Sequence, residues 1–241
     1  MSNKPVLLSV ITAVLNAEQQ LPRLIESLQS QSDRDFEWIV ADGGSTDSTF
    51  DLLSAVTGLN IKISSNPDFG IYDSLNRAIK ECSGEYYLVC GADDVLFENA
   101  IFHYKNEILL SDADIVTAKI MINDNVIEAG RYGWLYGMSE HISSHSVGSV
   151  FRKSLHDKYG YYSKLYPICS DKLFVGQAII AGASLRKSGF VAGIYSGGGT
   201  SSTYIAETLC ENFCIQLALG RNRIVQMLLL YLRLIKNFMR I

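Results

Sequence analysis

Residues 36–49 read FEWIVADGGSTDST, an apolar segment that runs into a loop of acidic, hydroxyl and glycine residues. The segment 36–41 predicts a buried strand, and Ser45 and Thr46 are candidate N-caps of a helix that continues to about residue 56. A strand that leads through a polar loop directly into a helix is the repeating unit of α/β proteins. This stretch therefore predicts a strand–loop–helix unit, with its loop at the carboxyl end of the strand.

The same alternation extends through the first hundred residues. Further strands are expected over 6–14, 61–64 and 86–90, and further helices over 18–31, 73–82 and 97–110. Helices that connect successive strands imply right-handed crossovers and a mostly parallel central sheet flanked by helices. Such a sheet binds ligands at the carboxyl ends of its strands, so the loops there are candidate sites.

The second half of the chain departs from simple alternation. A strand over 114–122 and an NDN turn at 123–125 predict a hairpin with 126–132. A loop-rich stretch follows, and then helix 171–182, strand 189–195 and helices 204–219 and 222–240. No linker, repeat or low-complexity tract interrupts the chain, which favours a single domain over residues 1–241.

The composition limits the class of protein. Of 241 residues, 48% are hydrophobic and 19% are charged, so the chain can bury a large core and is neither disordered, collagen-like nor a disulfide mini-scaffold. The formal net charge of −4 provides no global basic field, and we expect no nucleic-acid partner.

The five cysteines are odd in number and have neither CxxC nor zinc-site spacing. We interpret them as buried or half-buried free thiols of a protein in a reducing compartment. Cys210 and Cys214 lie one helical turn apart, which suits a packed helix face.

Two apolar runs bear on the location of the protein. Residues 6–15 are not followed by a small-residue cleavage site, which favours a buried strand over a signal peptide. Residues 224–235 are interrupted by Gln226 and Arg233 and fall short of the ~20 apolar residues that span a bilayer. We therefore expect a cytoplasmic protein.

The C-terminal tail is basic and apolar. Residues 212–241 contain no acid and five cations, at Arg221, Arg223, Arg233, Lys236 and Arg240. Interleaved apolar residues predict a basic amphipathic helix, which would lie peripherally on the inner face of the cytoplasmic membrane. A helix packed on the domain with its basic residues outward is the alternative. The oligomeric state is left open.

Polar clusters follow four predicted strands directly. They are Thr12–Asn16, Asp42–Asp47, Asp68–Asp73 and Asp93–Asp94. Because the carboxyl ends of parallel strands meet at one edge of a sheet, the four clusters are expected to converge there.

The adjacent acids Asp93 and Asp94 are candidates for a metal site. Mg²⁺ and Mn²⁺ take a few carboxylate oxygens, with substrate phosphates and waters completing the octahedron. An acid pair that caps the following helix is the alternative. Asp42 is a candidate to accept a hydrogen bond from a base N–H. Its loop has no GK[ST] and the first strand is not followed by GxGxxG, so neither a P-loop nor a dinucleotide site is expected.

Residues 68–79, DFGIYDSLNRAI, are the most distinctive stretch. Asp68 and Gly70 lie in a turn, Asp73 is placed to cap a helix, and Asn76 and Arg77 share its face. Arg77 is expected either near a phosphate or paired with Asp73.

The chain resembles family 2 glycosyltransferases, in particular the branch of colanic-acid-type and other polysaccharide-assembly transferases. The resemblance rests on TAVLN (12–16), ADGGSTDST (41–49), DFGIYDSLNRAI (68–79) and GADD (91–94), in that order, and covers about residues 5–100. It implies the α/β nucleotide-diphospho-sugar transferase fold, with a nucleotide-sugar-binding half over about 1–110, an acceptor-side half over about 111–203 and C-terminal helices over about 204–241.

The resemblance also implies roles for single residues. Asp94 would bind Mg²⁺ or Mn²⁺ and take part in catalysis, Asp93 would lie near the ribose, and Asp42 would hold a uracil or other pyrimidine. The other residues implied at the nucleotide-diphospho-sugar donor are Thr12, Asn16, Asp68, Gly70 and Asn76. Many members carry a further acid where this chain has Gly91, which leaves fewer carboxylates for a metal.

The resemblance places a catalytic acid at the start of a helix in the second half, where this chain has Asp171 in CSDK (169–172). Its role would be that of general base toward the acceptor hydroxyl, and a helix N-terminal acid without a catalytic role is the alternative. His145 and Arg152 are candidates for acceptor or phosphate contacts, against a structural histidine and an arginine at the surface. The loop SGGGTSS (196–202) would close over the diphosphate or serve as a connector.

Together these features predict an inverting glycosyltransferase. It would move a sugar from a UDP-sugar to a glycan or polyprenyl-diphosphate-linked acceptor in the synthesis of cell-surface polysaccharide, lipopolysaccharide or exopolysaccharide. The alternatives are a catalytically degenerate scaffold protein that binds sugar nucleotides, and a sugar-nucleotidyltransferase. The latter needs a Gly-rich basic loop after the first strand, which TAVLNAEQQ lacks.

Overall fold

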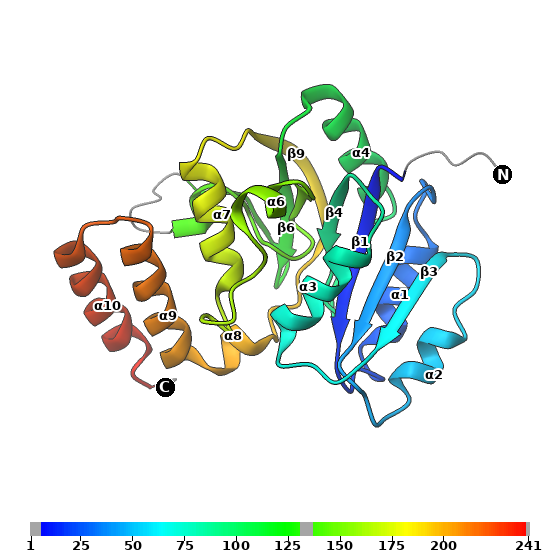
Figure 1. Cartoon of the computed structure of the whole chain (residues 1–241), viewed down its shortest axis with the longest axis horizontal. Helices are drawn as coiled ribbons and strands as arrows, with labels where there is room; N and C mark the ends of the chain where they lie inside the picture. Colours follow the sequence, from blue (N-terminus) through cyan, green and yellow to red (C-terminus); the bar gives the residue numbers. More distant parts are fainter. Residues whose placement is uncertain (1–5, 131–136, 240–241) are drawn as a thin grey trace.

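A computed structural model describes residues 6–130 and 137–239 (Figure 1). Its strands in the described residues form one mixed sheet in the order β3-β2-β1-β4-β8-β6-β9-β5, with β7 paired to β6. The strands are β1 (Leu8–Val14), β2 (Glu37–Asp42), β3 (Asn60–Ser65), β4 (Tyr86–Val89), β5 (Val95–Leu96), β6 (Ile115–Ile122), β7 (Asn125–Ile127), β8 (Ser149–Arg152) and β9 (Leu185–Ile194). The α/β fold expected from the sequence is confirmed.

Helices connect and cover these strands. They are α1 (Leu21–Gln29), α2 (Thr49–Ser54), α3 (Ile71–Glu81), α4 (Ala100–Ser111), the 3₁₀ turn η1 (Gly137–Glu140), α6 (Leu155–Tyr159), α7 (Ser170–Ile180), α8 (Thr200–Thr203), α9 (Ile205–Ala218) and α10 (Arg223–Asn237). In Figure 1, α9 and α10 lie side by side at one end of the molecule, beyond α7.

The core has two apolar layers, one on each face of the sheet. In β1, Val10 packs into the layer that includes α1 and α4, and the next residue, Ile11, packs into the layer that includes α3 and α7. Successive side chains of a strand point to opposite faces, so a parallel sheet covered on both sides needs continuous apolar strands. This is why the run at 6–14 forms a buried strand.

The parallel part of the sheet matches the sequence expectation. The strand pairs β1–β2, β2–β3 and β1–β4 are parallel, and β6 forms the expected hairpin with β7, although residues 131 and 132 of that expectation lie outside the described residues. Two antiparallel strands, β5 and β8, were not expected, because segments of two and four residues have too little periodicity to be recognised. Strand β9 begins four residues earlier than expected, at Leu185.

The C-terminal helices correct one further expectation. Cys82, Cys90 and Cys169 are buried, but Cys210 and Cys214 are exposed on α9 instead of lying on a packed face. The buried side of this helix is formed by Ile215 and Gln216. Among the described residues, no helix combines the length and apolar character needed to cross a bilayer.

Two glycines of β9 provide a test of how closely β5 is packed. A Cβ atom at Gly193 would overlap the carbonyl oxygen of Val95 and lie 3.0 Å from Cα of Leu96, whereas a Cβ atom at Gly189 would meet nothing within 4 Å. We expect Gly193→Ala to lower the free energy of unfolding by about 1–3 kcal/mol, because backbone atoms of β5 must move. Urea denaturation measures this change.

Gly189→Ala is the matched control in the same strand. It should leave stability unchanged or slightly raised, since alanine restricts the unfolded chain. Equal denaturation midpoints for the two variants would contradict the close approach of β9 to β5.

Candidate active site

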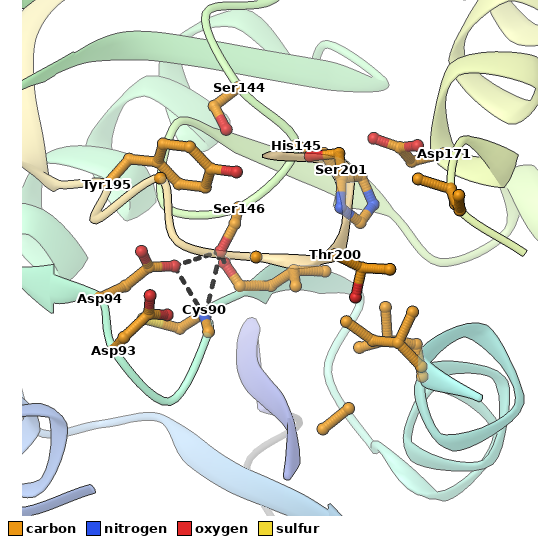
Figure 2. A pocket seen from close by; sticks show the side chains of 18 of the residues that line it. Cys90, Asp93, Asp94, Ser144, His145, Ser146, Asp171, Tyr195, Thr200 and Ser201 are labelled. Carbon is orange, nitrogen blue, oxygen red and sulfur yellow. Dashed lines mark hydrogen bonds between the residues drawn. The ribbon is translucent and has the colours of Figure 1, made fainter. Parts of the chain in front are cut away.

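A cavity of about 290 Å³ lies at the carboxyl end of β4 (Figure 2). It is lined on one side by Asp93 and Asp94, and on the other by Asp171 at the start of α7. The segment 143–146 and the segment that follows β9 complete its wall. Acids and hydroxyls from both halves of the chain therefore face one space.

The carboxylate of Asp94 binds three segments that form or adjoin the wall of the cavity. Its Oδ2 atom accepts hydrogen bonds from the backbone N–H of Gly91 at 2.8 Å and from Oγ of Ser146 at 2.5 Å, and its Oδ1 accepts one from the N–H of Ser196 at 3.2 Å. The residue is 1% exposed. Burial raises the pKa of the Asp94 carboxyl above its usual range and the nearby Asp93 adds to this, while the hydrogen bonds oppose it.

The carboxylates of Asp93 and Asp94 both lie beside Gly91. A Cβ atom on Gly91 would lie 2.9 Å from Oδ2 of Asp94 and 3.0 Å from Oδ1 of Asp93. In the described part of the chain, neither acid forms an ion pair with a basic side chain. Two crowded carboxylates without a cationic partner fit a bound cation.

A divalent ion here would need ligands beyond the protein. Residues 6–130 and 137–239 contain no group of three or more acids, histidines or cysteines arranged to hold a metal. Mg²⁺ is commonly bound by one or two carboxylates, with substrate phosphates and waters supplying the rest. The oxygen pair of Asp93 and Asp94 fits that arrangement.

Asp171 lies across the cavity from the acid pair, as Figure 2 shows. Its Oδ1 accepts a hydrogen bond of 2.6 Å from the hydroxyl of Tyr72, which also lines the cavity. The buried Tyr72 hydroxyl stays protonated, because desolvation and the charge of Asp171 both raise its pKa. Tyr72 thus orients the carboxylate through one oxygen, and within the described ranges no other hydrogen bond to the carboxylate oxygens of Asp171 is found.

The loops after β1, β2 and β3 are joined by hydrogen bonds. Oδ1 of Asn16 accepts from the N–H of Thr46 at 2.9 Å, and Oγ of Ser45 accepts from the N–H of Asn16 at 2.8 Å. The N–H of Asn66 after β3 donates to the carbonyl oxygen of Asp42 at 3.0 Å. The side chain of Asp68 lies against Gly43, where a Cβ atom would be 2.6 Å from Oδ2 of Asp68. The convergence expected for the strand ends is confirmed.

The family model described as "Glycosyl transferase family 2" matches residues 9–174, more than half of the chain. The chain belongs to this family. It is therefore a glycosyltransferase, and the sheet that surrounds the cavity is the α/β fold of that class.

Known relatives agree with this assignment. A protein named PGL/p-HBAD biosynthesis glycosyltransferase from Mycobacterium bovis is 26% identical over 230 residues, covering 88% of this chain and 86% of that protein. The solved structure of S. aureus TarS 1–349 in complex with UDP-GlcNAc has a TM-score of 0.72 at 19% identity and covers 96% of this chain and 72% of that chain. The transferase spans 43% of a longer solved TarS chain.

A mannosyltransferase from Pyrobaculum calidifontis, solved in complex with GDP-Man and Mn²⁺, has a TM-score of 0.68 at 12% identity and covers 98% of this chain and 76% of that chain. At these identities the solved structures support the fold of the transferase.

Of the residues expected at the donor, only Asp93 is among those that line the cavity. Asn16, Asp68 and Gly70 lie outside its lining, and Asp68 accepts hydrogen bonds from the N–H of Gly70 and from Oγ of Ser74.

Thr12, Asp42 and Asn76 are occupied by other contacts. Thr12 is fully buried and its Oγ1 accepts from the Trp38 indole at 3.0 Å, because position 12 points to the α1 side of the sheet. Asp42 is also fully buried, with its oxygens accepting from Ser45 and Ser65, so in this structure it fixes the loop rather than reaching a ligand.

Asn76 is the third residue that is not free to bind the donor. Its amide donates to the carbonyl of Tyr162 at 2.9 Å and accepts from the N–H of the same residue at 3.0 Å. Its neighbour Arg77 does not pair with Asp73. Instead, Nη2 of Arg77 donates to the carbonyl oxygen of Asn66, the residue directly after β3, at 3.1 Å.

The expected phosphate contact of Arg152 is wrong. Arg152 pairs with Tyr86 at the amino end of β4, at the opposite end of the strand from the cavity. There its guanidinium is bound by Glu85, Asp112 and Asp114. Strand β8 is antiparallel to β4, so its first residues lie near the cavity and its last residue lies far from it.

Several cavity residues were not assigned a role from the sequence. They are Tyr72, Ser146, Lys172 and Tyr195. Tyr72 belongs to the motif at 68–79 and Ser146 is next to the candidate His145, so both lay within stretches that had been singled out. Residues of the expected loop SGGGTSS (196–202) also line the cavity. The first residue of this loop, Ser196, binds Asp94, 102 positions away, and no local pattern indicates that partner.

Arg152→Gln tests the corrected position of this side chain. We expect the free energy of unfolding to fall by about 1–3 kcal/mol, because three carboxylates lose a charged donor. The affinity of the transferase for nucleoside diphosphates should be unchanged, which isothermal titration calorimetry measures.

Arg186→Gln is the matched control, since Arg186 forms a more exposed ion pair with Glu107. It should change stability by less than about 1 kcal/mol. A loss of nucleotide affinity in the Arg152 variant alone would restore its phosphate role.

Proposed function

We propose that this family 2 transferase moves a sugar from a UDP-sugar to a hydroxyl group, with inversion at the anomeric carbon. The acceptor would be a glycan or a polyprenyl-diphosphate-linked sugar in cell-surface polysaccharide synthesis. The observation that carries the proposal is the placement of Asp93 and Asp94 on one side of a single cavity and Asp171 on the other. The UDP-GlcNAc complex of TarS supports a UDP-sugar.

The acid pair would act on the leaving group. Asp94, with Asp93 beside it, would hold Mg²⁺ or Mn²⁺ against the donor diphosphate, and the GDP-Man and Mn²⁺ complex of the Pyrobaculum enzyme supports such an ion. When bound, the ion supplies positive charge that stabilises the diphosphate as it departs. Asn16, Asp68 and Gly70 remain the candidates for contacts with the nucleotide, because they lie in the loops and turn that meet the loop after β2, outside the cavity itself.

Asp171 would act on the acceptor. The Oδ2 atom, which Tyr72 does not bind, would take the proton as the acceptor oxygen forms its bond to the anomeric carbon. The bond from that carbon to the diphosphate oxygen breaks at the same time, and its electron pair leaves with the diphosphate. Attack from the side of Asp171, with departure toward Asp94, inverts the configuration.

Near-isosteric variants of the two acids separate these roles. A panel of UDP, GDP, dTDP, CDP and ADP, each with and without Mn²⁺, is tested by thermal shift on the native chain. We expect a metal-dependent rise in the melting temperature with UDP, of roughly 5–10 °C at a hundredfold excess over Kd. Asp94→Asn should lose this metal-dependent rise, whereas Asp171→Asn should keep it.

Turnover of the UDP-sugar completes the comparison. Asp171→Asn should transfer sugar about 10²- to 10⁴-fold more slowly, because the general base is lost. A normal rate in this variant would overturn the assignment of the base. No shift with any nucleotide, from a folded sample, would overturn the donor assignment and favour a scaffold protein.

The outer face of α10 supports a membrane location for the acceptor. Six apolar residues of this helix are 55–69% exposed, namely Ile224, Met227, Leu228, Tyr231, Leu232 and Ile235. The buried side includes the polar Gln226. A surface helix normally turns its apolar stripe inward, so this outward stripe indicates an apolar partner.

The positive charge of residues 212–241 indicates which apolar partner covers α10. Residues 212–241 contain no acid and five cations, of which Arg223 and Lys236 are exposed on α10, whereas Arg233 lines a cavity on the inner side of this helix. The exposed cations complement a bilayer surface that contains anionic lipids. We propose that α10 lies in such a surface, so that a lipid-linked acceptor is held close to the transferase.

Co-sedimentation with vesicles tests this contact. We expect binding to vesicles of phosphatidylglycerol and phosphatidylcholine, and weak binding to phosphatidylcholine alone. Replacing Leu228 and Ile235 together by Glu should abolish binding, whereas the same change at the exposed Leu109 and Leu110 of α4 should not. Absence of binding by the native chain, or a dimer that the α10 variant dissociates, would overturn the proposal.

A further inference from the structure

A chain of buried hydrogen bonds leads from the cavity into the core. Nε2 of His145 lies 2.6 Å from the hydroxyl of Tyr162, which lies 2.8 Å from the hydroxyl of Tyr87. The Tyr87 hydroxyl lies 2.8 Å from Nε2 of His156, whose Nδ1 lies 3.0 Å from the carbonyl oxygen of Gly160. All four side chains are at most 8% exposed.

The last hydrogen bond of this series, between His156 and Gly160, determines which group donates at every step. A carbonyl oxygen only accepts, so Nδ1 of His156 carries a proton and donates it to Gly160. In a neutral ring Nε2 then has the lone pair, and the Tyr87 hydroxyl donates to it. Each tyrosine has one proton to donate, so Tyr162 donates to Tyr87 and must accept from His145.

The proton of a neutral His145 therefore lies on Nε2, and its Nδ1 has the lone pair. Nδ1 has no hydrogen-bond partner in the described ranges, yet it is not a buried unsatisfied atom, so it is open to the cavity that the ring lines. Burial lowers the pKa of His145, against the opposing charge of Asp171, and lowers the pKa of His156 to about 4. Both rings are neutral near pH 7.

The charged and titratable groups around the chain do not reverse this direction. Burial raises the pKa of Tyr87 and of Tyr162, so both hydroxyls remain donors. Asp157 and Lys153 act on the pKa of His156 in opposite directions, and His145 itself lowers it.

His145 lies where the transferred sugar would be. The next residue, Ser146, binds Asp94, and the charge of Asp171 acts on His145 itself. In Figure 2 the imidazole ring lies between these two acids. The anomeric carbon must lie between the diphosphate and the general base, so the sugar ring attached to it would pass beside Nδ1.

We propose that Tyr162, Tyr87 and His156 are positioning residues that hold His145 in the Nε2-protonated tautomer, so that Nδ1 accepts a hydrogen bond from a hydroxyl of the donor sugar. The identity of the sugar rests on the proposed function, whereas the tautomer does not. Asn76 supports the chain from outside, because its two hydrogen bonds hold the backbone of Tyr162. Asn76 would therefore serve the donor indirectly.

Long-range ¹H–¹⁵N correlation spectra of ¹⁵N-histidine-labelled protein test the tautomers directly, without any ligand. His145→Gln and His156→Gln assign the two rings by loss of signals. We expect His145 to be protonated at Nε2 and His156 at Nδ1. Protonation of His145 at Nδ1, or an average of the two forms, would overturn the proposal.

Tyr87→Phe breaks the chain at its centre. The Tyr162 hydroxyl then loses its acceptor and turns to donate to Nε2 of His145, so we expect this ring to shift toward the Nδ1-protonated form. Tyr86→Phe is the matched control, since the adjacent, equally buried Tyr86 donates to the carbonyl of Ala113 outside the chain. It should leave the tautomer unchanged, and a Tyr87 variant that also does so would refute the relay.

Sugar nucleotides test the hydroxyl contact. UDP-glucose, UDP-galactose and UDP-GlcNAc are compared with UDP, in the presence of Mg²⁺. We expect at least one UDP-sugar, but not UDP, to shift the Nδ1 resonance. In Tyr87→Phe and His145→Phe, the affinity for that UDP-sugar should fall by about 3- to 10-fold relative to the affinity for UDP. His145→Gln, whose side chain keeps a donor and an acceptor, should bind the UDP-sugar more tightly than His145→Phe.

The outcomes separate this proposal from the proposed function. Binding of UDP with no effect of any UDP-sugar on Nδ1 overturns the hydroxyl contact alone. Failure of every nucleotide to bind overturns the UDP-sugar donor and the hydroxyl contact with it, while the spectra of the free protein still decide the tautomer.

Discussion

The carboxylate of Asp94 is the contact on which the cavity depends. It accepts hydrogen bonds from Gly91, from Ser146 52 positions later and from Ser196 102 positions later. A buried carboxylate is costly unless hydrogen-bond donors surround it, and its raised pKa shows that burial still disfavours the charge. The need to satisfy this one side chain joins three distant segments into one wall.

The direction of β8 decides which residues reach that wall. Because β8 runs antiparallel to β4, the residues before it, His145 and Ser146, lie at the carboxyl end of β4. Its last residue, Arg152, lies at the other end among Glu85, Asp112 and Asp114. Two candidates seven residues apart in sequence are thus separated by the length of a strand.

Helix α3 connects the two sides of the site. The turn before it carries Asp68 and Gly70 beside the loop after β2. From its first turn Tyr72 binds Asp171, and from its middle Asn76 holds Tyr162. The motif at 68–79 therefore does more than border the donor, because its helix also orients groups that come from the second half of the chain.

The alternation of strands and helices, and the sheet edge where Asp93 and Asp94 lie, could be predicted from the sequence. Both follow from local periodicity and from the rule that parallel strands end together. Asp171 was expected from the resemblance to family 2 glycosyltransferases. Only the tertiary structure shows that Thr12 and Asp42 are buried and that Arg152 lies at the amino end of β4. The same holds for the series of hydrogen bonds from His145 to His156. The physical reason is that burial and hydrogen-bond partners depend on contacts between residues tens of positions apart, which no local pattern encodes.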